Sequence, residues 1–71
     1  MLSRTHFVIF KSDTQYSITE CSTSGVKQVF LSQGTVSGDE SVLDRLSQTK
    51  PESVSIESYV ENNAGHLIFE S

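Results

Sequence analysis

The residues of this chain that could carry nucleophilic or metal chemistry are few: Cys21 is the only cysteine, and His6 and His66 are the only histidines. Both histidines stand at the starts of predicted strands, so strand pairing could bring them near one another and near Cys21 or Glu20. No two of these residues have the spacing of a metal-ligating motif, such as two histidines one helical turn apart. We therefore expect no metal site and no cofactor, and we interpret both histidines as surface or edge residues.

Cys21 is a poor candidate for a catalytic nucleophile. A cysteine can pair with a histidine base, but Cys21 follows Glu20 and has no basic residue within several positions. Nothing in its local sequence therefore favours the reactive thiolate. We interpret it as a half-buried structural thiol. Because a lone thiol fits a reducing compartment, we expect a cytoplasmic protein.

Neighbouring carboxylates, Asp39 with Glu40 and Glu57 with Glu61, are the candidates for acid–base chemistry. Such catalysis needs two carboxylates in different environments, one of them with a pKa raised by burial. These pairs lie at a predicted helix start and on a polar strand face, where solvent should keep them ordinary. We predict no catalytic residue, and we do not expect an enzyme.

Negative charge gathers in the C-terminal half of the chain. Residues 1–38 carry three basic against two acidic residues, and residues 39–71 carry two basic against seven acidic, giving a net charge of −4. This pattern lacks the basic footprint of a nucleic-acid-binding protein. It suits contact with a basic surface on another protein. The candidate partner-binding residues are Asp39, Glu40, Asp44, Glu57 and Glu61.

The elements that would position these groups follow from apolar periodicity and turn residues. Short apolar runs and period-two alternation predict strands. The predicted strands are His6–Lys11, Gln15–Ser22, Val26–Ser32, Val54–Val60 and His66–Glu70. The segment 26–32 also fits a helical face, but a strand is favoured because the run is short and continuous.

One helix is predicted between the third and fourth strands. Ser37 and Glu40 have the spacing of a capping box, in which each side chain bonds the other residue's amide. Val42 and Leu46 then share one face, and Pro51 ends the helix, which spans roughly 38–49. The order β-β-β-α-β-β predicts a single small α+β domain over residues 1–71. Its one short helix would pack on one face of an antiparallel sheet of about five strands.

A chain of 71 residues with 35% hydrophobic residues can form only a thin core. We predict Phe7, Ile9 and Phe69 as core residues, because each lies in an apolar run of a predicted strand. Self-association would add stability, so we expect a two-fold dimer that pairs residues 66–69 edge to edge. A plain monomer is the competing interpretation.

The longest apolar run, residues 7–10, is far too short to cross a bilayer, so no membrane partner is expected. The sequence favours a small non-catalytic protein-interaction module that acts as an adaptor, regulator or inhibitor. An alternative is a subunit of a small-ligand or metal-dependent enzyme, with a site of His6, His66 and Cys21 completed by a second chain. A weaker alternative is nucleic-acid binding by the N-terminal half, where the charge is positive.

Overall fold

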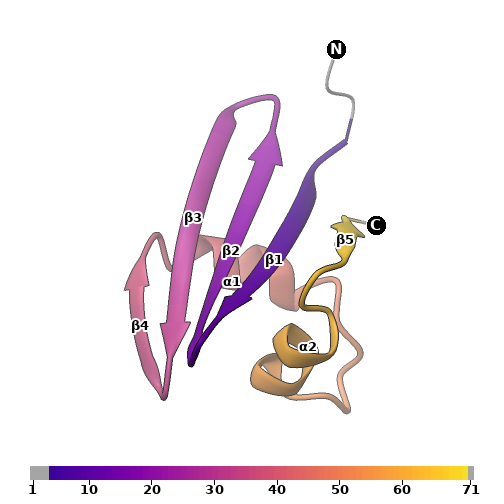
Figure 1. Cartoon of the computed structure of the whole chain (residues 1–71). Coiled ribbons are helices and arrows are strands. Elements are labelled where there is room, and N and C mark those ends of the chain that lie inside the picture. Colours follow the sequence, from indigo (N-terminus) through magenta and orange to yellow (C-terminus); the bar gives the residue numbers. More distant parts are fainter. Residues whose placement is uncertain (1–3, 71) are drawn as a thin grey trace.

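The computed structural model describes residues 4–70, which form an antiparallel sheet with two short helices. Along the chain the elements are β1 (His6–Ser12), β2 (Gln15–Ser22), β3 (Gly25–Ser32), β4 (Thr35–Gly38), α1 (Ser41–Ser47), α2 (Ile56–Asn62) and β5 (Leu67–Phe69) (Figure 1). Among the described residues, neither helix has the length and apolar character needed to cross a membrane.

The five strands lie in the order β4-β3-β2-β1-β5, and every neighbouring pair is antiparallel. The predicted α+β class with a small antiparallel sheet is therefore confirmed, and the segment 26–32 is a strand. Two-residue turns join the first four strands. In the turn after β3, Gln33 and Gly34 both have positive φ, of 47° and 85°. This is the backbone of the tight hairpin turn whose twist matches that of the strands.

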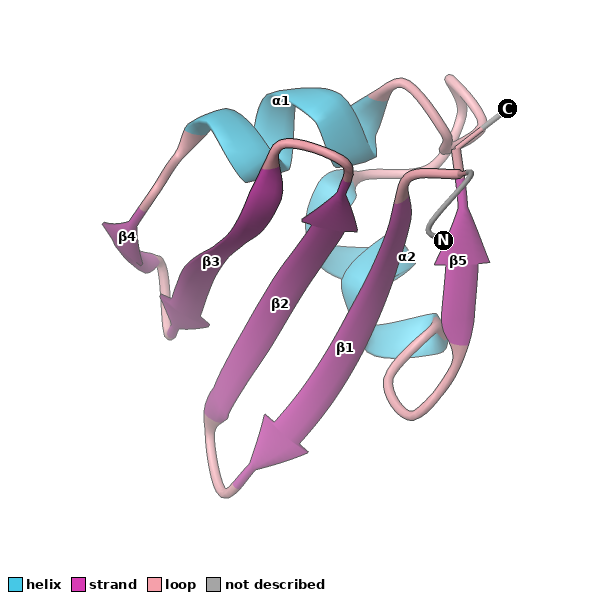
Figure 2. Cartoon of the chain, turned by 90° about the horizontal axis from the view of Figure 1, so that it is seen from above, coloured by secondary structure: helices cyan, strands magenta, loops and turns pink. Residues whose placement is uncertain are grey.

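One face of the sheet carries the core. Alternate residues of the strands point to this face and pack against α1 and α2. The buried hydrophobic residues are Phe7, Ile9, Ile18, Val29, Val42, Leu46, Val60 and Ile68. Figure 2 shows both helices and the long loop between them on the same side of the sheet. The other face is not covered by any described element.

The core prediction is confirmed for Phe7 and Ile9 and wrong for Phe69. Both Phe7 and Ile9 have no solvent exposure, whereas Phe69 is 45% exposed. In β5 the inward position belongs to Ile68, which pairs with Phe7. Because side chains alternate along a strand, Phe69 must then point to the uncovered face.

The predicted helix over 38–49 is wrong at its start. Residues 35–38 form β4, and α1 begins at Ser41, so Ser37 lies in a strand and is not a cap. Gly38 has φ of +89°, and a Cβ there would come within 2.8 Å of the Gln28 carbonyl oxygen. The amide of Asp39 still donates to that carbonyl at 2.9 Å. Pairing with β3 thus extends past Ser37 and displaces the capping box.

The predicted strand over Val54–Val60 is a helix, so the observed order is β-β-β-β-α-α-β. Ile56, Tyr59 and Val60 stand three and four positions apart and all contact the core. This is helical spacing, so the strand prediction for this segment is wrong. Ser55 caps α2 by accepting from the Ser58 amide at 3.2 Å.

Candidate functional site

The candidate site is the uncovered face of the sheet, which we call the open face. Strand register arranges its side chains in four rows across β1, β2 and β3. From the β1–β2 turn outward the rows are Ser12–Gln15–Ser32, Phe10–Ser17–Phe30, Val8–Thr19–Gln28 and His6–Cys21–Val26. β5 lengthens two of them, placing Leu67 beside Val8 and Phe69 beside His6.

Side-chain size varies in the same way along the last three of these rows. In them the middle strand, β2, contributes the short side chains of Ser17, Thr19 and Cys21, whereas the row at the turn has the longer Gln15 in the middle. Longer side chains from β1 and β3 flank them on both sides. The open face is therefore lowest along β2, a strip that we call the β2 strip. At its centre the Thr19 hydroxyl accepts from the Gln28 amide group at 2.9 Å.

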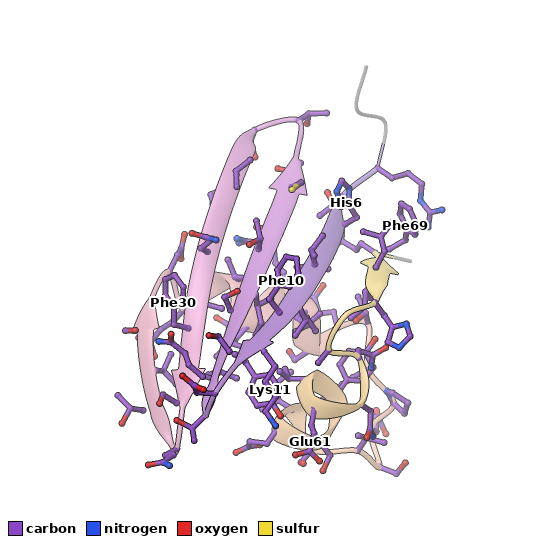
Figure 3. All side chains as sticks on the ribbon, viewed as in Figure 1. His6, Phe10, Lys11, Phe30, Glu61 and Phe69 are labelled. Carbon is purple, nitrogen blue, oxygen red and sulfur yellow. The ribbon has the colours of Figure 1, made fainter. Side chains whose placement is uncertain are left out.

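Exposed hydrophobic surface is concentrated on the open face. Phe10 is 64% exposed and Val26 is 68% exposed, while Leu67 and Phe69 are 53% and 45% exposed. In Figure 3 the rings of Phe10, Phe30 and Phe69 come from three different strands of this sheet. Among the described residues, the remaining exposed large hydrophobic is Val36, 38% exposed. Val36 pairs with Leu31 of β3, and Leu31 pairs with Tyr16 of β2. Val36 therefore belongs to the strand positions that alternate with those of the open face.

The rows of the open face contain no Asp, Glu, Lys or Arg. Among residues 4–70, positive charge lies at one corner of this face, where the Arg4 guanidinium carbon is 4.6 Å from the centre of the Phe69 ring. The His6 ring packs against the same phenyl ring at 5.9 Å between centres. This corner is an aromatic cluster with a cation at its rim.

The acidic candidates from the sequence lie elsewhere, on or beside the two helices. Glu40 and Asp44 at α1, and Glu57 and Glu61 on α2, are all exposed. Figure 3 shows Glu61 beside α2, away from the labelled rings of the open face. The structure therefore separates the molecule into an acidic helix side and an uncharged open face.

Asp39 differs from the other acidic candidates because it has an internal partner. Its Oδ1 accepts hydrogen bonds from the Ser41 hydroxyl at 2.5 Å and from the Ser41 amide at 3.0 Å. Both bonds hold the pKa of Asp39 below its ordinary value, and the bond from the Ser41 hydroxyl has the larger effect. Asp39 thus orders the chain at the start of α1, a role predicted from the sequence for Ser37.

Arg45 and Glu20 form an ion pair that was not predicted from the sequence. Arg45 donates from Nε and Nη2 to the two carboxylate oxygens, at 2.5 and 2.6 Å, and Glu20 is only 3% exposed. Hydrogen bonding to Glu20 raises the pKa of Arg45. The alternation of Tyr16, Ile18 and Glu20 was the available signal, since it places all three on the core face.

A hollow of about 250 Å³ lies beside this ion pair. Its lining combines hydroxyl side chains with both signs of charge, namely Lys27 and Arg45 with Glu20 and Glu70. The charges largely balance, so the hollow does not select a ligand by charge.

The two histidines are not brought together. His6 pairs with Phe69 at the end of β5, whereas His66 precedes the start of that strand and is exposed. Cys21 lies opposite His6 on the open face. Within residues 4–70 there is no group of three or more His, Cys, Asp or Glu side chains arranged to hold a metal ion.

Comparisons with protein-family models, with curated proteins and with solved structures found no match to this chain. The functional argument therefore rests on the geometry and charge of the open face and of the helix side.

Proposed function

We propose that this protein is a small non-catalytic interaction module that binds protein through its open face. The observation that carries the proposal is the concentration of exposed hydrophobic side chains on the one side of the sheet that no described element covers. Phe10, Val26, Leu67 and Phe69 together expose surface on the order of 400 Å². Exposed apolar surface of that extent gathered on one face often marks an interaction site on soluble proteins.

The chemistry of the open face suits a protein partner better than a nucleic acid. Bases can stack on aromatic rings, but binding a strand also requires cations that follow its phosphates. The lysines of β1 and β3 do not provide such cations on the open face. Lys11 pairs with Tyr16 and Lys27 pairs with Glu20, so both occupy the core-face set of strand positions.

The acidic helix side supports a second, electrostatic contribution. Both basic side chains of residues 39–70 have internal partners: Arg45 binds Glu20, and Lys50 donates to the Val54 carbonyl at 2.7 Å. The exposed carboxylates near them therefore present net negative charge. We propose that Glu40, Asp44, Glu57 and Glu61 favour partners with a basic surface. The free thiol of Cys21 supports a cytoplasmic site of action.

Affinity capture with matched variants tests this function. Wild type, Phe10→Thr, Val36→Thr and the double variant Glu57→Gln/Glu61→Gln would be used as baits in extract of the native host. We expect Phe10→Thr to lose the captured proteins and Val36→Thr to keep them, because only Phe10 lies on the open face. The double variant Glu57→Gln/Glu61→Gln should bind its partners more weakly than wild type does. This difference should shrink in high salt, which screens the lost charges. Equal capture by wild type and Phe10→Thr would contradict the proposal.

A further inference from the structure

We infer that the partner of the open face is a second copy of this chain, which forms a two-fold dimer with its two sheets face to face. This inference rests on the proposed function, because it requires the open face to bind protein. Four features of the structure support it: the distribution of charge, the shape of the rows, the exposed apolar area and the shortness of the edge strands.

Charge favours this arrangement over other contacts between two chains that each carry −4. The exposed acidic side chains of α1 and α2 lie on the helix side, and the rows of the open face have none. Packing the open faces together leaves both helix layers outside. With layers about 10 Å apart, the two acidic surfaces are separated by roughly 30 Å, several Debye lengths in physiological salt. The repulsion between the copies is then largely screened.

The rows are complementary to themselves. A two-fold axis parallel to the strands, between β1 and β2, places β1 of each copy over β2 of the other. The larger side chains of β1, Phe10 among them, then enter the low β2 strip of the second copy. The same rotation brings β5 of one copy over β3 of the other, so that Phe69 meets Val26. In this register Phe10 lies over Ser17, Leu67 over Gln28 and Phe69 over Val26. Each contact occurs twice, as an isologous interface requires.

The exposed apolar area matches what a stable dimer needs. A standard interface buries about 800 Å² on each partner, of which roughly 56–65% is apolar. The order of 400 Å² exposed by Phe10, Val26, Leu67 and Phe69 supplies most of that apolar share. The neighbouring hydroxyl and amide side chains, such as Ser17 and Gln28, supply polar surface.

The edges of the sheet are less suited to self-association. The two edge strands are β4, with four residues, and β5, with three. Pairing such short edges forms few backbone hydrogen bonds, and short edge strands are a common protection against edge pairing. We therefore replace the edge-to-edge dimer expected from the sequence with a face-to-face dimer.

Sedimentation equilibrium over a micromolar to near-millimolar range tests the inference with matched variants. Wild type should approach twice the 7.8 kDa chain mass. Val26→Thr should weaken dimerisation about tenfold or more, because each copy buries an unpaired hydroxyl. Val36→Thr, the same change away from the open face, should leave it unchanged. Phe10→Lys should give a monomer, because a charge would enter the β2 strip of the second copy.

Cys21 provides a second measurement, since the dimer covers it with β1 of the second copy. Its reaction with a thiol reagent should slow as wild-type concentration rises, and should not depend on concentration in Phe10→Lys. If Phe10→Lys fails to fold by circular dichroism, the comparison of Val26→Thr with Val36→Thr decides.

A wild type that remains monomeric throughout the range overturns the dimer. If wild type is monomeric but Phe10→Thr still loses the captured proteins, the proposed function stands without the dimer. If capture by Phe10→Thr is also unchanged, both the dimer and the proposed function are wrong. A dimer weakened equally by Val26→Thr and Val36→Thr, or unaffected by Phe10→Lys, also overturns the face-to-face arrangement.

Discussion

The guanidinium of Arg45, on α1, closes over the carboxylate of Glu20, on β2, through hydrogen bonds of 2.5 and 2.6 Å. Glu20 is the one buried charged residue of residues 4–70. Arg45 Nη2 also donates to the Ser41 hydroxyl at 3.1 Å, and that hydroxyl donates to Asp39. This chain of polar contacts joins the start of α1 to the core face of the sheet.

Removing the arginine should strongly destabilise the protein. Arg45→Met leaves the Glu20 carboxylate buried without its cation, which we expect to cost about 2–4 kcal/mol of unfolding free energy. The value lies below that of a fully buried pair because Arg45 keeps 34% of its side chain in solvent. Urea denaturation measures the change. The double variant Glu20→Leu/Arg45→Met should recover much of the loss; a double variant as unstable as Arg45→Met would contradict this account.

Phe7 and Phe69, close neighbours across β1 and β5, should respond very differently to truncation. Phe7→Ala removes a fully buried ring and should cost about 3–5 kcal/mol, enough to unfold much of a domain this small. Phe69→Ala should cost about 1 kcal/mol or less in dilute solution, because the ring is half exposed. Thermal melts separate the two, with Phe7→Leu as a milder substitution that keeps a measurable transition. Similar losses for both alanine variants would place Phe69 in the core.

Ser55, which caps α2, and Ser37, which lies in β4, give a matched pair of serine substitutions. Ser55→Ala removes the side-chain acceptor of the Ser58 amide at the start of α2 and should cost about 0.5–2 kcal/mol. Ser37→Ala lies in the exposed strand β4 and should change stability by less than about 0.5 kcal/mol. Urea midpoints of both variants check this. A larger loss of stability in Ser37→Ala than in Ser55→Ala would support the helix-capping role predicted for Ser37 from the sequence.

Asp39 should make stability depend on pH in the acidic range. Its pKa is lowered in the folded protein by its hydrogen bonds to Ser41, so the folded state favours the ionised carboxylate. The stabilisation is complete above the unfolded pKa of about 3.9 and is lost as pH falls through the folded pKa. Wild type should therefore exceed Asp39→Asn in stability at neutral pH, and this difference should shrink below about pH 4. If the difference in stability between wild type and Asp39→Asn stayed constant down to about pH 2, the ionised Asp39 carboxylate would not have the stabilising role assigned to it.

The amino-acid sequence was sufficient to predict the first two strands, and it favoured a strand over a helix for the third. A short apolar run predicted β1, alternation predicted β2, and each turn between the first three strands involves only two residues, which limits the possible registers. Residues 7–10 form a continuous apolar run, which predicted Phe7 and Ile9 as core residues but did not distinguish them from the exposed Phe10. The concentration of acidic residues in the second half was also visible before folding.

Tertiary structure decided the elements after residue 35, because their local signals fit two structures. Ser37 and Glu40 satisfy a capping box, but the hydrogen bond from Asp39 to Gln28 keeps the chain on the sheet until Gly38. Likewise, Ile56, Tyr59 and Val60 bury their side chains only once α2 packs on the core.

The open face and the Arg45–Glu20 pair depend on the same long-range contacts. Leu67, Ile68 and Phe69 form one apolar run, and only the pairing of β5 with β1 settles which side chain enters the core and which two face outward. Glu20 and Arg45 stand 25 residues apart, and their attraction becomes possible only when α1 lies across β2. Local propensity is fixed by neighbours in the chain, whereas burial and ion pairing are fixed by neighbours in space.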